Sequence, residues 1–397
     1  MQPTTEVAAK PGNVGVPIEA VTAGHELTTS RGSHFVVDGR VDDPTDGYLP
    51  GRSSCIARSF NVLASTPDRA GSGDMLFLDT ETTGLDRGTG THVFLVGLGY
   101  FEGDRFRVEQ HFLRDLHEEG SLLCELQRLL QSFSMLVTFN GRGFDWPLLS
   151  NKFILHGYRD IPVLQHWDLL TPSRRVWRNR LRDCSLGSLE RNVLDVHRTG
   201  DIPGFLIPQL YFDYLRSRDA GPLKPVFSHN HIDIVSLARL AARLLRTEDD
   251  PFLMLEDATD RISFGCQLLN SGDGEVAEAL ILPEVDSGNV DAEVRFRAAR
   301  LLANRYKRDR RWSEAIDLWN RLRQCEWANV DQMLYPLVEL SKVYEHQLRE
   351  FEIAIRYVQR AMNICELYGS TGAHKELVHR YSRLRRRAGA TMSIGRV

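Results

Sequence analysis

The sequence predicts an α/β domain, a mixed sheet flanked by helices, followed by an all-α domain. The first prediction rests on residues 74–247, where apolar runs of strand length alternate with amphipathic helical segments. The second rests on the residues from 258 onward, where the apolar patterns have helical spacing. A polar stretch with Gly and Pro precedes both. We therefore expect a weakly ordered leader over 1–70, an α/β domain over 71–250 and a helical domain over 258–390.

The spacing of apolar residues predicts the elements of the α/β domain in chain order. In the leader, His34–Val41 is a candidate for a small strand or hairpin that packs on the next domain. The predicted strands are Met75–Asp79, Val93–Phe101, Phe106–Phe112 and Met135–Phe139. The predicted helices are Glu118–Phe133, Phe144–His156 and Val226–Arg246. Three strands followed by helix, strand and helix are typical of a mixed sheet, because the short turn at 102–104 favours an antiparallel hairpin.

Two segments of the helical domain resemble each other at an offset of about 38 residues. Leu302–Tyr306 is followed by Ala315 and Trp319, and Leu340–Tyr344 is followed by Ala354 and Val358. These intervals fit the helical hairpin repeat called TPR, with a slight insertion. A generic helical bundle is the alternative. This part of the sequence shows no clustered carboxylates, so we assign it to interaction rather than chemistry.

Composition limits the classes of function. The 397 residues carry a formal net charge of −4, so a nucleic-acid site requires a local basic patch. The six Cys are scattered without a C-x-x-C pair, which argues against a zinc site and favours reduced thiols. No apolar run approaches the roughly 18–20 residues of a membrane span, and the N-terminus lacks a signal-peptide pattern. We therefore expect a cytoplasmic protein with no membrane partner.

Asp79 and Glu81 follow the apolar run Met75–Leu78 and are separated by one residue. Because side chains alternate along a strand, both carboxylates are expected on one face. Two like charges at this separation raise each other's pKa, unless a cation lies between them. Hard divalent ions such as Mg²⁺ prefer oxygen ligands, so the pair is a candidate metal site. The alternative is a solvated turn.

Two later segments carry further candidates. In the first, a strand ends in a Gly-rich turn with Asn140, and Asp145 follows in the first turn of a helix. In the second, His229 and Asp233 are four positions apart, which places them on one helix face. A helix cap explains Asp145 singly, a turn explains Asn140, and an exposed helix start explains His229.

Together the segments read Asp-x-Glu, Asn-x-x-x-Phe-Asp and His-x-x-x-Asp. This ordered set resembles the DEDD superfamily of RNase H-like 3′–5′ exonucleases. More narrowly, it is similar to the YprB-like bacterial type, in which such a domain precedes C-terminal TPR repeats. The resemblance covers residues 74–247, and loosely 295–365. It implies metal ligation by four carboxylates, which fall on Asp79, Glu81, Asp145 and Asp233.

The resemblance further implies two Mg²⁺ or Mn²⁺ ions and a general base at His229. The base and the last Asp are separated by three residues, the spacing common in subfamilies whose base is Tyr rather than His. An imidazole titrates near neutral pH, which suits the removal of a proton from water. The implied activity is hydrolysis of phosphodiester bonds in single-stranded or frayed DNA during repair, with a helicase as a candidate partner of the repeats. A ribonuclease, an endonuclease on the same scaffold and a non-catalytic adaptor are the alternatives.

The strongest basic stretch lies at 174–182, inside the α/β domain. Arg side chains bind phosphates bidentately, and an interleaved Trp stacks on unpaired bases. A solvated charged helix face is the alternative. Asp168 is a candidate accessory acid or helix cap. The candidate nucleic-acid contacts are Asn140, Phe144, Arg174, Arg175, Trp177, Arg178 and Arg180.

Overall fold

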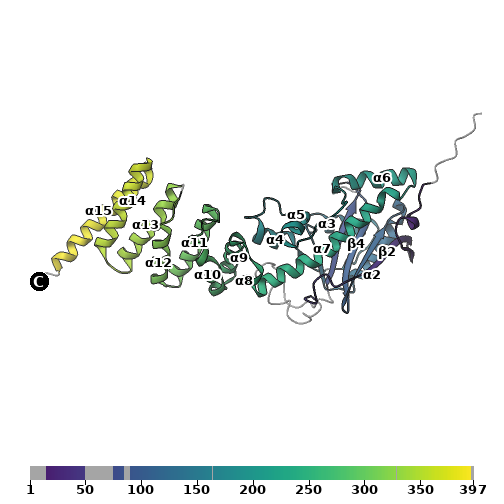
Figure 1. Ribbon diagram of the computed structural model, residues 1–397, viewed down its shortest axis with the longest axis horizontal. Coiled ribbons are helices and arrows are strands. Elements are labelled where there is room, and N and C mark those ends of the chain that lie inside the picture. Colours follow the sequence, from purple (N-terminus) through teal and green to yellow (C-terminus); the bar gives the residue numbers. More distant parts are fainter. Residues whose placement is uncertain (1–14, 50–74, 85–89, 163, 328, 395–397) are drawn as a thin grey trace, which may run out of the picture. The chain divides into compact units, whose positions relative to one another are not determined.

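The computed structural model describes residues 15–49, 75–84, 90–162, 164–327 and 329–394 (Figure 1). The chain divides into two compact units. The first, the sheet unit, consists of residues 1–174 and 181–250. The second, the helical unit, consists of residues 175–180 and 251–397. Among the described residues, the helices are too short or too polar to cross a membrane.

The sheet unit is built on seven strands in the order β1-β2-β5-β4-β3-β6-β7. β3 pairs with β6, and β6 with β7, in parallel, whereas the other neighbours are antiparallel. The predicted mixed sheet is therefore confirmed. The strands are β1 His25–Thr29, β2 Gly32–Asp42, β3 Met75–Thr82, β4 Val93–Glu102, β5 Arg105–Phe112, β6 Met135–Thr138 and β7 Gln165–Asp168.

The strand predicted at His34–Val41 is confirmed as part of β2, but the prediction of a weakly ordered leader is wrong for the rest of residues 15–49. β1 and β2 form a hairpin there, and β2 pairs with β5 along its length, from Phe35 opposite Phe112 to Asp42 opposite Arg105. Phe35 and Val36 are buried, but most of the other residues of β2 are polar or glycine. The composition of this segment therefore resembles that of a linker. Residues 1–14 and 50–70 lie outside the described part of the chain.

Helices cover both faces of the sheet. The long helix α7 (Lys224–Asp249) crosses one face (Figure 1), where Gly97 and Gly99 of β4 let it approach closely. On the other face, Leu76 and Leu78 of β3 share one core with leucines of α2 (Glu119–Leu130) and α3 (Asp145–Leu155). The remaining helices of this part of the chain are α4 Leu170–Trp177, α5 Leu186–Val193 and α6 Ile207–Ser217, with short 3-10 turns η5 Gly204–Leu206 and η6 Gly221–Leu223.

The helical unit contains α8 to α15 around two further cores. α11 and α12 are followed by α13 and α14, and α13 begins at Val330, 38 residues after the start of α11 at Ala292. An all-helical second domain is thus confirmed, while its TPR type remains a prediction. The helices are α8 Pro251–Met254, α9 Ala258–Ser271, α10 Gly274–Ile281, α11 Ala292–Arg308, α12 Trp312–Leu322, α13 Val330–His346, α14 Phe351–Tyr368 and α15 Thr371–Ile394.

Candidate functional site

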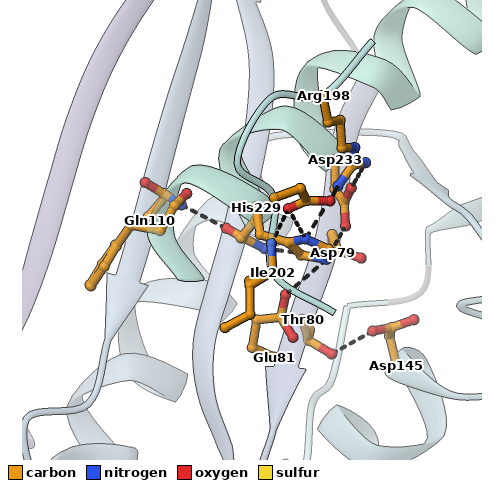
Figure 2. Close-up of polar contacts among 12 residues, drawn as sticks. Asp79, Thr80, Glu81, Gln110, Asp145, Arg198, Ile202, His229 and Asp233 are labelled. Carbon is orange, nitrogen blue, oxygen red and sulfur yellow. Dashed lines mark hydrogen bonds and ion pairs between the residues drawn. The ribbon is translucent and has the colours of Figure 1, made fainter. Parts of the chain in front are cut away.

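Asp79 and Glu81 lie near the end of β3 and point to the same face of the sheet, toward α7 (Figure 2). The alternation of the strand produces this arrangement, since Asp79 lies opposite Gly97 of β4 and Glu81 lies opposite Leu95. Both side chains are largely shielded from solvent. The predicted pair of adjacent carboxylates is therefore present.

His229 and Asp233 lie one turn apart on α7 and face Glu81 (Figure 2). His229 Nε2 lies 3.4 Å from Asp233 Oδ2 and 4.0 Å from Glu81 Oε1. Each of the three side chains offers an atom within 4.8 Å of the other two. Three of the predicted residues, which come from two separate segments, thus meet at one point.

Asp79 is held by an amide that the motifs do not include. Asn230 Nδ2 donates to Asp79 Oδ2 (2.9 Å), and Gln110 Nε2 of β5 donates to Asn230 Oδ1 (2.9 Å). Asn230 is fully buried. Gly97 leaves the space for it, because a Cβ atom at this position would lie 2.3 Å from Asn230 Oδ1. Gly97 and Asn230 therefore fix the orientation of the Asp79 carboxylate.

Asp145 begins α3 and lies beside β3, but its carboxylate has a different partner. Asp145 Oδ1 accepts a hydrogen bond from Thr80 Oγ1, and the alternation of β3 turns Thr80 to the face opposite Asp79 and Glu81 (Figure 2). Its charge still raises the pKa of both Asp79 and Glu81, so the three carboxylates interact. The role of Asp145 as a metal ligand remains a prediction.

Arg198 is a functional candidate that the sequence reasoning missed. It lies between α5 and η5, and its guanidinium donates to Asp233 Oδ1 (Figure 2). It also donates to Glu190 and to Asp201 Oδ2. Asp201 Oδ1 in turn lies 2.7 Å from His229 Nδ1. This loop has neither helical nor strand periodicity, so a sequence pattern gives no sign that it reaches the site.

Burial and mutual repulsion raise the pKa values of the carboxyl groups. Desolvation is the largest cause for Glu81, followed by the charges of Asp233 and Asp145, and its pKa reaches about 8. Desolvation also raises the pKa of Asp145 to about 6, against the hydrogen bond from Thr80. The pKa values of Asp79 and Asp233 are raised for the same first reason, although His229 and Arg198 oppose the shift at Asp233.

The side chains of this site fit a hard divalent cation. Carboxylate oxygens are the ligands that Mg²⁺ and Mn²⁺ prefer, and an imidazole is also accepted by Mn²⁺. Neighbouring carboxylates raise each other's pKa, and a cation bound between them lowers these pKa values again. Glu81, His229 and Asp233 offer one group of ligand atoms, and Asp79 and Asp145 lie close enough to act on it electrostatically.

The structure corrects part of the predicted nucleic-acid contact. Trp177 is 1% exposed, so its ring is in the core and cannot stack on a base. Arg180 forms an ion pair with Asp260 at 2.7 Å, within the helical unit. Arg174 and Arg178 are exposed and Arg175 is half-buried. The basic stretch is therefore in part structural, and the roles of these three Arg remain predictions.

The turn after β6 is organised by Asp168. Its Oδ1 accepts hydrogen bonds from the backbone N–H groups of Asn140 (2.8 Å) and Leu170 (3.0 Å), and its Oδ2 accepts one from Arg142 (3.1 Å). These contacts give Asp168 the capping role rather than that of an accessory acid. Asn140 has a φ of 65° and is exposed, and Phe144 is half-buried. Their contacts with nucleic acid remain predictions.

Two comparisons with known proteins agree with this fold. Residues 76–245 match the family described as the RNase H superfamily. Over 300 residues the chain is 30% identical to the uncharacterized protein YprB of Bacillus subtilis, which covers 73% of this chain and 69% of the relative. The matched residues include Asp79, Glu81, Asp145 and Asp233. The chain therefore belongs to the family of YprB, and its residues 76–245 match the RNase H superfamily.

Proposed function

We propose that this protein is a metal-dependent 3′–5′ exonuclease that hydrolyses phosphodiester bonds of DNA at single-stranded or frayed ends. One observation carries the proposal: Glu81 and Asp233 meet His229 near the end of β3, with Asp79 and Asp145 within electrostatic reach. An RNase H-like fold is a nuclease scaffold, and a cluster of buried acids is the arrangement that holds divalent ions against a phosphodiester.

The chain's own residues supply the proton transfer and the positioning. Asp201 accepts from His229 Nδ1–H, which leaves Nε2 as the nitrogen that faces Glu81 and Asp233. In this proposal Nε2 is the base that takes the proton of a water molecule, so the carboxylates rather than His229 hold the metal. Asn230 keeps Asp79 oriented during the reaction. Two Mg²⁺ or Mn²⁺ ions, when bound, lower the pKa of water and stabilise charge on the phosphate.

The finer parts of this proposal rest on the resemblance of the ordered motifs to DEDD exonucleases. These parts are the 3′–5′ direction, the preference for DNA and a role in DNA repair. The free thiols of Cys124, Cys266, Cys325 and Cys365 support a place in the reducing cytoplasm.

We assign the helical unit to partner binding through TPR-like hairpins, with a helicase as the candidate partner. A cavity of about 580 Å³ lined by the segment after α12, by α13 and by α14 supports this role, because Arg323 and Arg360 line it beside Leu367 and Tyr368. The last two side chains are 78% and 53% exposed, which is unusual for apolar residues without a partner. Copurification of a helicase with the wild-type chain, and its loss with Leu367→Asp, is the expected result.

The nuclease activity is tested with labelled substrates. We expect the wild-type protein with Mn²⁺ to shorten single-stranded DNA labelled at its 5′ end, and to leave the same strand intact when its 3′ end is blocked. Asp79→Asn should lose activity by at least about a hundredfold, because charge stabilisation supplies most of the catalysis. Asp104→Asn, in the exposed turn between β4 and β5, is the matched control.

Each alternative has its own result. Equal product from wild type and Asp79→Asn would contradict the assigned site. Cleavage of the blocked strand would identify an endonuclease, and degradation of RNA without DNA would identify a ribonuclease. An absence of product from the wild type on both substrates would favour the adaptor.

A further inference from the structure

Arg198 uses its guanidinium almost entirely on carboxylates. Nε and Nη2 donate to the two oxygens of Glu190, each at 2.6 Å, in the parallel two-bond geometry that is strongest for this pair. Nη1 donates to Asp201 Oδ2 at 3.1 Å, and Nη2 also donates to Asp233 Oδ1. The Arg198 side chain is 11% exposed and that of Glu190 is 1% exposed. Arg198 is therefore anchored by Glu190 and reaches Asp233 with the second N–H of Nη2, while Nη1 also lies 3.2 Å from His229 Nδ1.

The two carboxylates that Nη2 contacts, those of Asp233 and Glu190, differ in whether they belong to the candidate metal site. Glu190 accepts from the edge of the guanidinium formed by Nε and Nη2. Asp233 belongs to the group of ligand atoms with Glu81 and His229. Arg198 bonds Asp233 Oδ1, whereas Oδ2 is the oxygen that lies 3.4 Å from His229 Nε2. A metal ion that binds Oδ2 therefore shares one carboxylate with the positive charge of Arg198, and the two cations repel each other. Metal and Arg198 thus compete for the same carboxylate, whereas Glu190 holds the guanidinium in place in either case.

A cavity of about 450 Å³ adjoins this contact. Asp233, His229, Arg198 and Asp201 are among the residues that line it. The volume is within the range of small-ligand sites, and so suits a group of nucleotide size. A phosphate that enters here meets the N–H of Nη2 once Asp233 no longer accepts it. Planar guanidinium groups bind phosphate oxygens well, because their N–H donors are fixed in direction and always charged.

We propose that Arg198 is a phosphate-binding residue whose resting partner, in the metal-free protein, is Asp233. When metal takes Asp233, Glu190 keeps the guanidinium in position and the released N–H of Nη2 binds a phosphate oxygen of the nucleic-acid strand. Metal binding and substrate binding are thereby coupled through one side chain. This inference rests on the proposed function, and it adds a substrate contact outside the acidic motifs.

The metal half of the inference is tested without any reaction. Mn²⁺ binding is measured by titration calorimetry on the full chain for wild type, Arg198→Gln and Arg216→Gln. Arg216 lies in an exposed ion pair with Asp213 on α6 and loses the same charge from the same unit. We expect Arg198→Gln to bind Mn²⁺ at least about tenfold more tightly, because a competing full charge is removed. Unchanged or weaker binding would overturn the competition.

The phosphate half is tested by fluorescence anisotropy of labelled single-stranded DNA in Ca²⁺. We expect Arg198→Gln to bind this DNA at least about tenfold more weakly, while Arg216→Gln binds within about twofold of wild type. If Arg198→Gln does not fold by circular dichroism, Arg198→Lys replaces it. A lysine keeps the charge but lacks the fixed fork, so DNA binding should weaken by at least about threefold. Wild-type affinity in the folded variant would overturn the phosphate role.

Failure of this inference is distinguishable from failure of the proposed function. Unchanged metal and DNA affinity in Arg198→Gln, together with DNA cleavage by the wild type, would remove Arg198 from substrate binding and leave the nuclease intact. The predicted affinity changes without cleavage by the wild type would support Arg198 as a phosphate contact of a binding protein.

Discussion

The carboxyl groups of Asp79, Glu81, Asp145 and Asp233 should make the metal-free protein less stable as pH rises. The variant Glu81→Gln should lose much less stability over the same pH range. Burial and the neighbouring charges raise the pKa of Glu81 from 4.5 to about 8. The folded chain therefore holds this proton more tightly than the unfolded chain. Its stabilising contribution is complete below pH 4.5 and is lost as pH rises through about 8.

The pKa shift sets the magnitude of the effect. One pKa unit corresponds to about 1.4 kcal/mol, so full ionisation of Glu81 in the folded state costs about 5 kcal/mol relative to the unfolded chain. Glutamine keeps the shape of the side chain and cannot ionise. Asp79 and Asp233 also have raised pKa values, so part of the pH dependence will remain in the variant.

Urea denaturation in EDTA at pH 5 and pH 8.5 measures this difference. We expect the wild type to lose several kcal/mol of unfolding free energy between the two pH values, and Glu81→Gln to lose clearly less. Mn²⁺ should restore the wild type at pH 8.5 more than the variant. Asp104→Asn, an exposed acid, is the control. An equal loss of stability in wild type and Glu81→Gln would refute the reasoning.

Three further predictions follow from single contacts. Gly97→Ala should lower nuclease activity at least about tenfold in the Mn²⁺ assay, because a Cβ atom would displace the amide that orients Asp79. Gly39→Ala is the control and should leave activity unchanged, because a Cβ atom there would lie 3.9 Å from the nearest neighbouring atom. Thr80→Val removes the hydrogen bond that lowers the pKa of Asp145, so the acid limb of the pH–activity profile should move to higher pH; an unmoved limb would contradict this role. Glu345→Ala should destabilise the helical unit by about 2 kcal/mol in thermal unfolding, because the buried carboxylate pairs with three Arg of α15.

Local patterns were sufficient for the residues that sit on regular elements. The alternation of β3 predicts that Asp79 and Glu81 share a face, and the helical repeat predicts that His229 and Asp233 do so. Both pairs are placed as predicted. That the two pairs meet follows from tertiary packing, which no pattern within one segment contains. Only the resemblance of the ordered motifs to a known superfamily predicted that the two pairs meet.

The residues that escaped prediction act through long-range contacts. Arg198 reaches Asp233 from a loop 35 positions away, and Gln110 reaches Asn230 across 120 positions. Trp177 misled in the opposite direction, because its place among arginines suggested exposure, whereas the tertiary fold buries it. Local composition reports the average polarity of a segment, but the fold decides which side chain of that segment faces the interior.

The pairing of β2 with β5 has a consequence for any shortened form of this protein. The sequence suggests residue 71 as the start of a shortened chain, yet such a chain would leave β5 as an edge strand of the sheet. Eight residues of β5, from Arg105 to Phe112, would then offer backbone N–H and C=O groups to any passing strand. Such a chain should self-associate by strand addition. The two N-terminal strands, distant from the acidic motifs in sequence, act as a shield against aggregation.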